Sequence, residues 1–242
     1  MYLMGASLHQ LVAHWKEHPT KGFRIITFGS SNTEMHWHSE GHFNWVAWLN
    51  CMLREEIGKH IVIINQGIGG DTATNLLQRL DRDIVPLQPT AVIVTIGGND
   101  ANRGVPLENY RIQLEEIIDK IVQLGAIPIL QTYYCPLYEK MGKDMQRFPQ
   151  FVEVNRQIAR VKQIPLIDQY SYFEPFYRQN PKQYRKIMKD ELHVNPMGNL
   201  IMGYIAGNAF GLPQLSHIPN RLKFLFYWSL IQKYRDHYNF KS

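Results

Sequence analysis

Three apolar, β-branched runs of the chain each end in residues that could take part in acyl-transfer chemistry. Ser31 follows residues 24–28, Gly70 follows residues 61–65, and Asn99 follows residues 91–96. A serine hydroxyl can attack a carbonyl carbon, while a glycine N–H and an asparagine amide can donate hydrogen bonds to the oxyanion that forms. The three residues therefore predict nucleophilic catalysis, provided that a base accepts the proton of Ser31.

A suitable base lies late in the chain, where Asp190 precedes His193 by three residues. Histidine titrates near neutral pH, so it can take up a proton and return it. An aspartate in a turn just ahead of a helix can accept a hydrogen bond from the other ring nitrogen and fix the tautomer. We expect Ser31, Asp190 and His193 to be the catalytic residues. The N–H groups of Ser31 and Gly70 and the amide of Asn99 would form the oxyanion hole.

Apolar strands alternate with amphipathic helical segments, which predicts a parallel sheet covered by helices on both faces. The expected strands span residues 24–28, 61–65, 91–96, 127–132 and 165–168. We predict the flavodoxin-like strand order 2-1-3-4-5 with right-handed crossovers. In that order the first strand lies between the second and the third. Ser31, Gly70 and Asn99 would then meet beside the carboxyl ends of these three strands.

Helical spacing of apolar residues predicts the helices that cover this sheet. They span about residues 5–20, 43–57, 73–84, 107–124 and 151–162, with helical pieces over 170–189 and a helix that ends near 210. Asp71 or Thr72 could cap the third of them, and Asn195 followed by Pro196 is typical of a helix start. A tail over about 215–242 ends in one more helix. We expect a single α/β domain over residues 1–242.

Four short segments resemble the sequence blocks of the SGNH hydrolases, also called the GDSL esterase/lipase family. They are FGSSNT at 28–33, NQGIGGDT at 65–72, IGGND at 96–100 and DELH at 190–193, in the family's order and near its spacing. The resemblance implies a flavodoxin-like three-layer α/β/α fold and the hydrolysis of esters. By position it assigns the nucleophile to Ser31, the other oxyanion donors to Gly70 and Asn99, and the base and its partner to His193 and Asp190.

The chain departs from the family pattern at two places. Ser30 stands where Gly-Asp-Ser-Leu has its aspartate, and Gly69 stands where a serine is frequent. Because Ser30 and Ser31 are adjacent, either could in principle be the nucleophile. The alternation of side chains along the turn favours Ser31, which also holds the family's place.

Residues 35–43 and the loop that begins at Tyr133 could line the substrate pocket, with Trp37, His38 and Tyr133 as pocket walls. Core packing is an equally good interpretation of Tyr133. The histidines His36, His38 and His42 are close enough in sequence to suggest a metal cluster, but no cysteine or carboxylate partner accompanies them. We therefore expect no metal and no cofactor.

The net charge of +5 comes largely from basic residues late in the chain. No nucleic-acid recognition motif accompanies them, so we expect a solvated basic face and no nucleic-acid partner. No apolar run is long enough to span a bilayer, and the first residues lack the features of a signal peptide, which favours a cytoplasmic location. An apolar stripe in the tail should pack on its own domain, with a homo-oligomer contact or a membrane-surface contact as alternatives; it comprises Leu222, Leu225, Phe226, Ser229 and Leu230.

The residues together predict a serine esterase that works through an acyl-enzyme. The chain has no lid-like apolar segment, which favours a small acyl group such as acetyl on a carbohydrate. The alternatives are a lysophospholipase or thioesterase with a longer acyl chain, and a binding module that keeps the fold without turnover.

Overall fold

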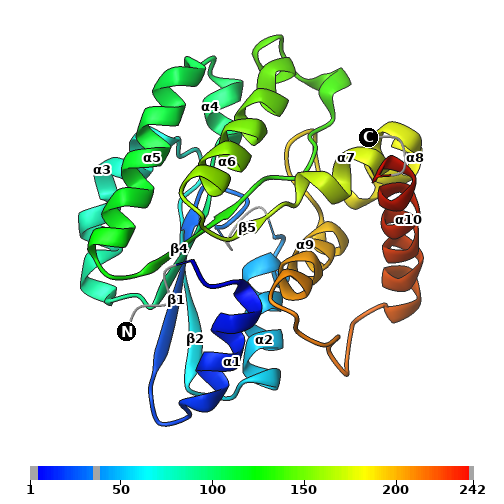
Figure 1. The fold of residues 1–242 in the computed structure, drawn as a ribbon. Coiled ribbons are helices and arrows are strands. Elements are labelled where there is room, and N and C mark those ends of the chain that lie inside the picture. Colours follow the sequence, from blue (N-terminus) through cyan, green and yellow to red (C-terminus); the bar gives the residue numbers. More distant parts are fainter. Residues whose placement is uncertain (1–4, 35–38, 240–242) are drawn as a thin grey trace.

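Five parallel strands form the centre of the molecule, and the computed structural model describes it over residues 5–34 and 39–239 (Figure 1). The strands lie in the order β2-β1-β3-β4-β5, which confirms the predicted flavodoxin-like topology. Their bounds are β1 Phe23–Gly29, β2 Ile61–Gly67, β3 Ala91–Thr95, β4 Ile127–Gln131 and β5 Leu166–Ile167. Every neighbouring pair is parallel, so the carboxyl ends of β1, β2 and β3 lie at one edge of the sheet.

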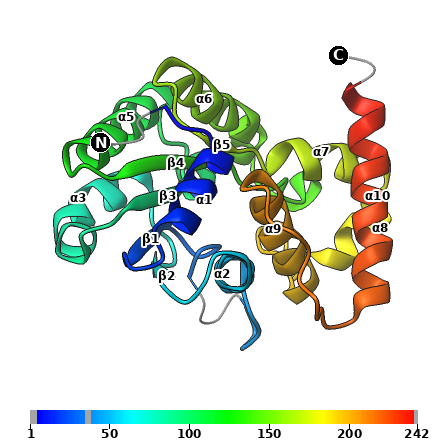
Figure 2. The same cartoon turned by 60° about the horizontal axis from the view of Figure 1, so that its bottom comes forward.

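Helices cover both faces of the sheet, which makes the fold a three-layer α/β/α sandwich (Figure 2). The helices α3, α5 and α6 lie on one face, and α1, α2 and α9 lie on the other. Their bounds are α1 Leu8–Glu17, α2 Trp45–Glu56, α3 Ala73–Asp83, α5 Leu107–Gln123, α6 Phe148–Val161 and α9 Pro196–Ala209. The short helix α4 (Gly98–Asn102) follows β3, while α7 (Tyr170–Gln179), α8 (Pro181–Tyr184) and α10 (Arg221–Asn239) lie outside this sandwich.

The strand register brings three turns to the same level. Gly29 at the end of β1 pairs with Gly67 at the end of β2 and with Thr95 at the end of β3. The residues that follow these three positions therefore leave the sheet side by side. Both faces of β1 and β3 are packed against helices, and β3 is buried at every position, as a central parallel strand should be.

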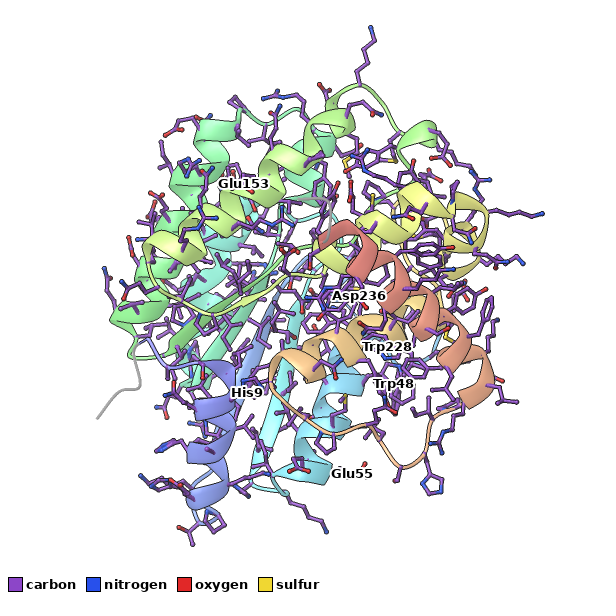
Figure 3. The ribbon with its side chains drawn as sticks, turned by 45° about the vertical axis from the view of Figure 1, so that its right-hand side comes forward. His9, Trp48, Glu55, Glu153, Trp228 and Asp236 are labelled. Atoms are coloured by element: carbon purple, nitrogen blue, oxygen red, sulfur yellow. The ribbon has the colours of Figure 1, made fainter. Side chains whose placement is uncertain are left out.

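The tail packs on its own domain, but through a different set of residues from the predicted stripe. Leu222, Leu225 and Phe226 are exposed, so the prediction that the whole stripe faces the domain is wrong. Among the side chains of α10 that the structure describes, the buried ones are Phe224, Tyr227 and Ile231. Trp228 of α10 lies against α9, where its ring is 6.4 Å from that of Tyr204 (Figure 3).

The remaining helices follow the predicted ranges to within a few residues, and α6 begins three residues earlier than expected. The first helix covers Leu8–Glu17 within the expected 5–20, and the expected strand 165–168 contributes only Leu166–Ile167 to the sheet. Within the described ranges, none of the helices has both the length and the apolar character needed to cross a membrane.

Candidate active site

Ser31 lies on a tight turn that leaves the sheet directly after β1. The turn is closed by Thr33 N and Glu34 N, which both donate to the carbonyl oxygen of Ser30 at 2.9 Å. Gly29 must be a glycine, because a Cβ there would lie 2.4 Å from Thr33 Oγ1 and 2.6 Å from a backbone oxygen of β3. The next helix within the described residues is α2, whose N-cap is Asn44, so no helix N-terminus directly follows Ser31 in the described part of the chain. The serine is instead presented by the turn itself.

Ser31, His193 and Asp190 form one hydrogen-bonded chain of side chains. His193 Nε2 lies 3.0 Å from Ser31 Oγ, and His193 Nδ1 lies 2.9 Å and 3.0 Å from the two carboxylate oxygens of Asp190. These residues come from opposite ends of the sequence, 162 positions apart for Ser31 and His193. The arrangement gives the serine oxygen a base and gives the base a fixed orientation.

Asp190 is held in its charged form. Burial alone would raise the pKa of this carboxyl, but hydrogen bonds from the His193 ring and from the backbone N–H groups of Leu192 and His193 outweigh it and lower the pKa to about 2. The carboxylate is therefore ionised throughout the pH range in which a histidine changes charge. It can stabilise a positive imidazolium on His193 as the serine proton arrives.

The segment that carries His193 is fixed at both ends. Lys189 N donates to the carbonyl oxygen of His193 at 2.8 Å, and Asn195 N donates to Ile187 O at 3.0 Å. Asn195 also caps α9 as predicted, since its side chain accepts from the backbone N–H groups of Met197 and Gly198, with Pro196 as the first helical residue. The base thus stands on a short loop just ahead of a capped helix.

The two other predicted oxyanion donors lie close together, Gly70 on the turn after β2 and Asn99 at the start of α4, which follows β3. Asn99 Nδ2 donates to the carbonyl oxygen of Asp71 at 2.8 Å, which joins the turn after β3 to the residue that follows Gly70. Gly70 has a φ of 84°, a conformation that favours glycine, and its carbonyl oxygen accepts from Arg103 at 2.8 Å. Thr72 is the N-cap of α3.

Asp100, next to Asn99, is fully buried and was not predicted to matter. Its Oδ1 accepts from the backbone N–H of Ala73 at 2.9 Å, so it ties the turn after β3 to the start of α3. Among the residues that the structure describes, its Oδ2 has no hydrogen-bond partner. Burial is the main reason that the pKa of Asp100 is raised to about 6, and the bond from Ala73 only partly offsets it.

This raised pKa predicts a stability that falls as the pH rises. Between the pKa of an unfolded aspartate, near 3.9, and about 6, the folded chain keeps a proton that the unfolded chain has lost. Asp100→Asn removes this contribution, so the variant should not lose stability in this way as the pH rises. From pH 4 to pH 7 we expect the difference in free energy of unfolding, variant minus parent, to increase by roughly 2–3 kcal/mol. Urea unfolding at several pH values measures the difference. If the free energies of unfolding of the two proteins differ by the same amount at every pH, the prediction is wrong.

Arg79 of α3 is a buried cation that sequence reasoning missed. Its side chain is 7% exposed, and its guanidinium lies 4.4 Å from the ring centroid of Phe28. It donates to four acceptors, which are Asp71 Oδ2 at 2.6 Å, Asp83 Oδ2 at 2.9 Å, Gly29 O at 3.1 Å and Gln66 O at 3.0 Å. One side chain therefore holds together the turns that carry Ser31 and Gly70. The signal was present in the sequence, since Arg79 is three residues after Leu76 on the apolar face of α3.

A narrow pocket opens beside Ser31. It is lined by Ser30, Ser31, Asn32, Gly98, Asn99, Tyr133, Tyr134, Pro136, Met145, Phe148 and Leu192. The free space inside it holds about one water-sized sphere. Ser31 and Asn99 share this pocket with predominantly aromatic and apolar side chains, while Gly70 is not among its described lining residues.

The predicted pocket walls have different outcomes. Tyr133 lines the pocket, and it also serves the core, since it is 4% exposed and its hydroxyl lies 2.6 Å from Ser30 Oγ. Trp37 and His38, like His36 of the suggested histidine cluster, lie outside the described residues. In the parts of the chain that the structure describes, no three histidine, cysteine or acidic side chains are placed to hold a metal ion.

A Ser–His–Asp chain at the carboxyl edge of a flavodoxin-like sheet defines a serine hydrolase of the SGNH class. Comparison with known families agrees: residues 27–201 match the GDSL-like Lipase/Acylhydrolase family, and the chain belongs to that family. The family resemblance drawn from the four sequence segments is thus confirmed, and the protein is an ester hydrolase.

Individual relatives are distant. The chain is 29% identical over 155 residues to the arylesterase of Vibrio mimicus, which covers 63% of this chain and 71% of the relative. It is 24% identical over 174 residues to the uncharacterized lipoprotein YqeF of Bacillus subtilis, covering 62% of this chain and 71% of that protein. The crystal structure of an acetylxylan esterase from Geobacillus stearothermophilus has a TM-score of 0.69 at 21% identity, over 81% of this chain and 98% of that one. At this identity the structural match shows the shared fold.

Proposed function

We propose that this esterase removes small acyl groups, in particular acetyl groups from carbohydrate esters, through an acyl-enzyme on Ser31. The observation that carries the proposal is the contact of Ser31 Oγ with His193 Nε2 at 3.0 Å, at the side of a pocket that also contains Asn99. The nucleophile and an amide donor thus line one small pocket, and the base contacts the nucleophile.

In the proposed reaction, Ser31 Oγ bonds to the ester carbonyl carbon while its proton passes to His193 Nε2. The negative oxygen that forms would accept hydrogen bonds from Asn99 Nδ2 and from the N–H groups of Gly70 and Ser31. The Asp71 carbonyl oxygen accepts a hydrogen bond from one N–H of the Asn99 amide and so orients the amide. The other N–H of the amide can then point at the oxyanion. The carbon–oxygen bond to the alcohol then breaks, and His193 gives its proton to the leaving oxygen. Water, deprotonated by the same histidine, releases the acid and restores Ser31.

The pocket supports a small acyl group. It is narrow and lined mostly by packed aromatic and apolar side chains, which favours a small acyl group over a longer chain. Tyr133, Tyr134 and Phe148 form much of its wall and are 2–4% exposed. A longer chain would have to displace packed aromatic rings, which is costly in a close-packed interior.

The relatives support the same class of substrate. The solved structures of the acetylxylan esterase include variants described as catalytic mutants, in which a serine, an aspartate or a histidine is replaced by alanine. Their aspartate and histidine are three positions apart, as Asp190 and His193 are here.

The cytoplasmic location remains a prediction, and one relative is named as a lipoprotein.

The first test combines covalent labelling with a series of esters. We expect a fluorophosphonate to attach to Ser31, seen by mass spectrometry of the labelled peptide. We also expect kcat/KM for p-nitrophenyl esters to fall by at least about tenfold from acetyl to octanoyl, because one or more methylene groups cannot enter the pocket. Acetylated xylo-oligosaccharides then test the carbohydrate part of the proposal.

Each alternative has its own outcome. Preference for octanoyl over acetyl would reject the small acyl group in favour of a thioesterase or lysophospholipase. Absence of labelling and of hydrolysis would indicate a binding module on the same fold. Turnover of p-nitrophenyl acetate without release of acetate from acetylated sugars would limit the proposal to the acyl group.

A further inference from the structure

The hydroxyl of Tyr134 contacts both segments that carry the proposed catalytic pair. It is hydrogen-bonded to the side chain of Asn32, which directly follows Ser31. It also lies 2.6 Å from Leu192 O and accepts from Val194 N at 3.1 Å. Leu192 and Val194 are the residues on either side of His193. One phenol oxygen thus bridges the serine turn and the histidine loop.

Packing holds Tyr134 in a fixed position, so its hydroxyl can fix the positions of the serine turn and the histidine loop. It follows β4, is 2% exposed, and its ring centroid lies 5.7 Å from Phe173 and 6.3 Å from Tyr133. Burial raises the pKa of Tyr134 well above its ordinary value, so the hydroxyl remains a hydrogen-bond donor. A hydroxyl can donate once and accept twice. When the Asn32 amide is turned so that its NH₂ group faces the Tyr134 hydroxyl, the hydroxyl donates to Leu192 O. It then accepts from Val194 N and from the Asn32 amide, so all three bonds are made.

Among the described residues, two further backbone bonds hold the histidine loop to segments other than the serine turn. Leu137 N donates to Glu191 O at 2.9 Å, and Asn195 N donates to Ile187 O at 3.0 Å. These bonds fix the loop on its outer side and at its end. Tyr134, in contrast, joins the loop to the serine turn beside the catalytic contact itself.

We infer that Tyr134 is a positioning residue, which holds His193 Nε2 at hydrogen-bonding distance from Ser31 Oγ by tying residues 192 and 194 to Asn32. The inference rests on the proposed function, because it assigns Tyr134 a part in the Ser31–His193 reaction. Tyr134 touches neither reacting atom and acts through the placement of the base. Small errors in such placement are expensive in rate, about a hundredfold for 1 Å.

The decisive variant is Tyr134→Phe, which keeps the packed ring and removes only the hydroxyl. We expect kcat for p-nitrophenyl acetate to fall about 10- to 100-fold with KM little changed, because substrate contacts are kept and the base is misplaced. Each rate is divided by the concentration of active sites, titrated with the fluorophosphonate to completion. This correction removes any loss that comes from unfolded protein, which a merely structural role would cause.

Tyr204→Phe is the matched control. Tyr204 is fully buried, and its hydroxyl also accepts a backbone N–H, from Leu215 at 3.0 Å, at a place outside the pocket. We expect its kcat per titrated site to match that of the parent. Asn32→Ala, which removes the other side of the bridge, should lower kcat in the same direction as Tyr134→Phe.

Hydrogen exchange tests the bridge without any substrate. In Tyr134→Phe the amide of Val194 loses its acceptor and should exchange about tenfold faster, while Tyr204→Phe leaves it unchanged. Unchanged exchange at Val194, a kcat per titrated site equal to that of the parent, or an effect on KM alone would each overturn the inference. If the parent neither hydrolyses esters nor takes the label, the proposed function fails instead, and the exchange result still decides whether Tyr134 holds the loop.

Discussion

Ser31→Ala is expected to lower kcat/KM for p-nitrophenyl acetate by at least about ten-thousand-fold while the fold is kept. The variant removes the hydroxyl oxygen that bonds to the acyl carbon in the proposed reaction, and alanine fits the turn without strain. Steady-state kinetics with the purified variant measures the loss, and circular dichroism checks the fold. A fall of less than tenfold would refute the assignment of Ser31.

Ser30→Ala is the control that separates the two adjacent serines. Ser30 Oγ lies 2.6 Å from the hydroxyl of Tyr133, and the base His193 contacts Ser31. We therefore expect a much smaller loss of activity, together with continued labelling of Ser31 by the fluorophosphonate. A dead Ser30→Ala variant beside an active Ser31→Ala variant would reverse the assignment.

The second large effect concerns stability, and it follows from the buried guanidinium of Arg79. In Arg79→Met, the carboxylates of Asp71 and Asp83 and two backbone carbonyls each lose one donor, although Asp83 keeps its bond from Arg82. The free energy of unfolding should fall by about 3–5 kcal/mol, because the partner charges stay in a poorly solvated place. That is a large fraction of the stability of an ordinary domain. Urea unfolding at neutral pH measures the change.

Arg82→Met provides the comparison on the same helix. Arg82 also bonds Asp83, at 2.6 Å, but its side chain is 70% exposed. The same loss of charge should change the stability much less, because the Arg82 guanidinium is well solvated and Asp83 keeps its bond from Arg79. Equal effects of the two substitutions would mean that the contacts of Arg79 with the turns after β1 and β2 do not matter.

Much of the arrangement could be predicted from the sequence because it depends on local patterns. Alternation of apolar strands with amphipathic helices was enough for the parallel sheet, and the strand order then placed the turns of Ser31, Gly70 and Asn99 together. The spacing of Asp190 and His193 predicted their mutual contact. The structure adds the distance of 3.0 Å between His193 and Ser31, which no local pattern contains.

What could not be predicted depends on contacts between distant segments. Tyr134 meets Leu192 and Asn32 across 58 and 102 positions, and no spacing rule connects them. The size of the pocket likewise depends on how the rings after β4 pack. The exposed residues of α10 show a different limit: Leu222 and Phe224 differ little as residue types, and only the position of the helix decides which of them is buried.

The level pairing of Gly29 with Gly67 and Thr95 also limits how such a chain can vary in length. Adding one residue to β1 would advance its end by about 3.3 Å and turn each later side chain to the opposite face. Insertions and deletions should therefore be rejected within β1, β2 and β3 and tolerated in exposed parts of the connection between α9 and α10, such as residues 213–214. A library of single-codon insertions screened for ester hydrolysis would reveal this division as a map of permitted and forbidden sites.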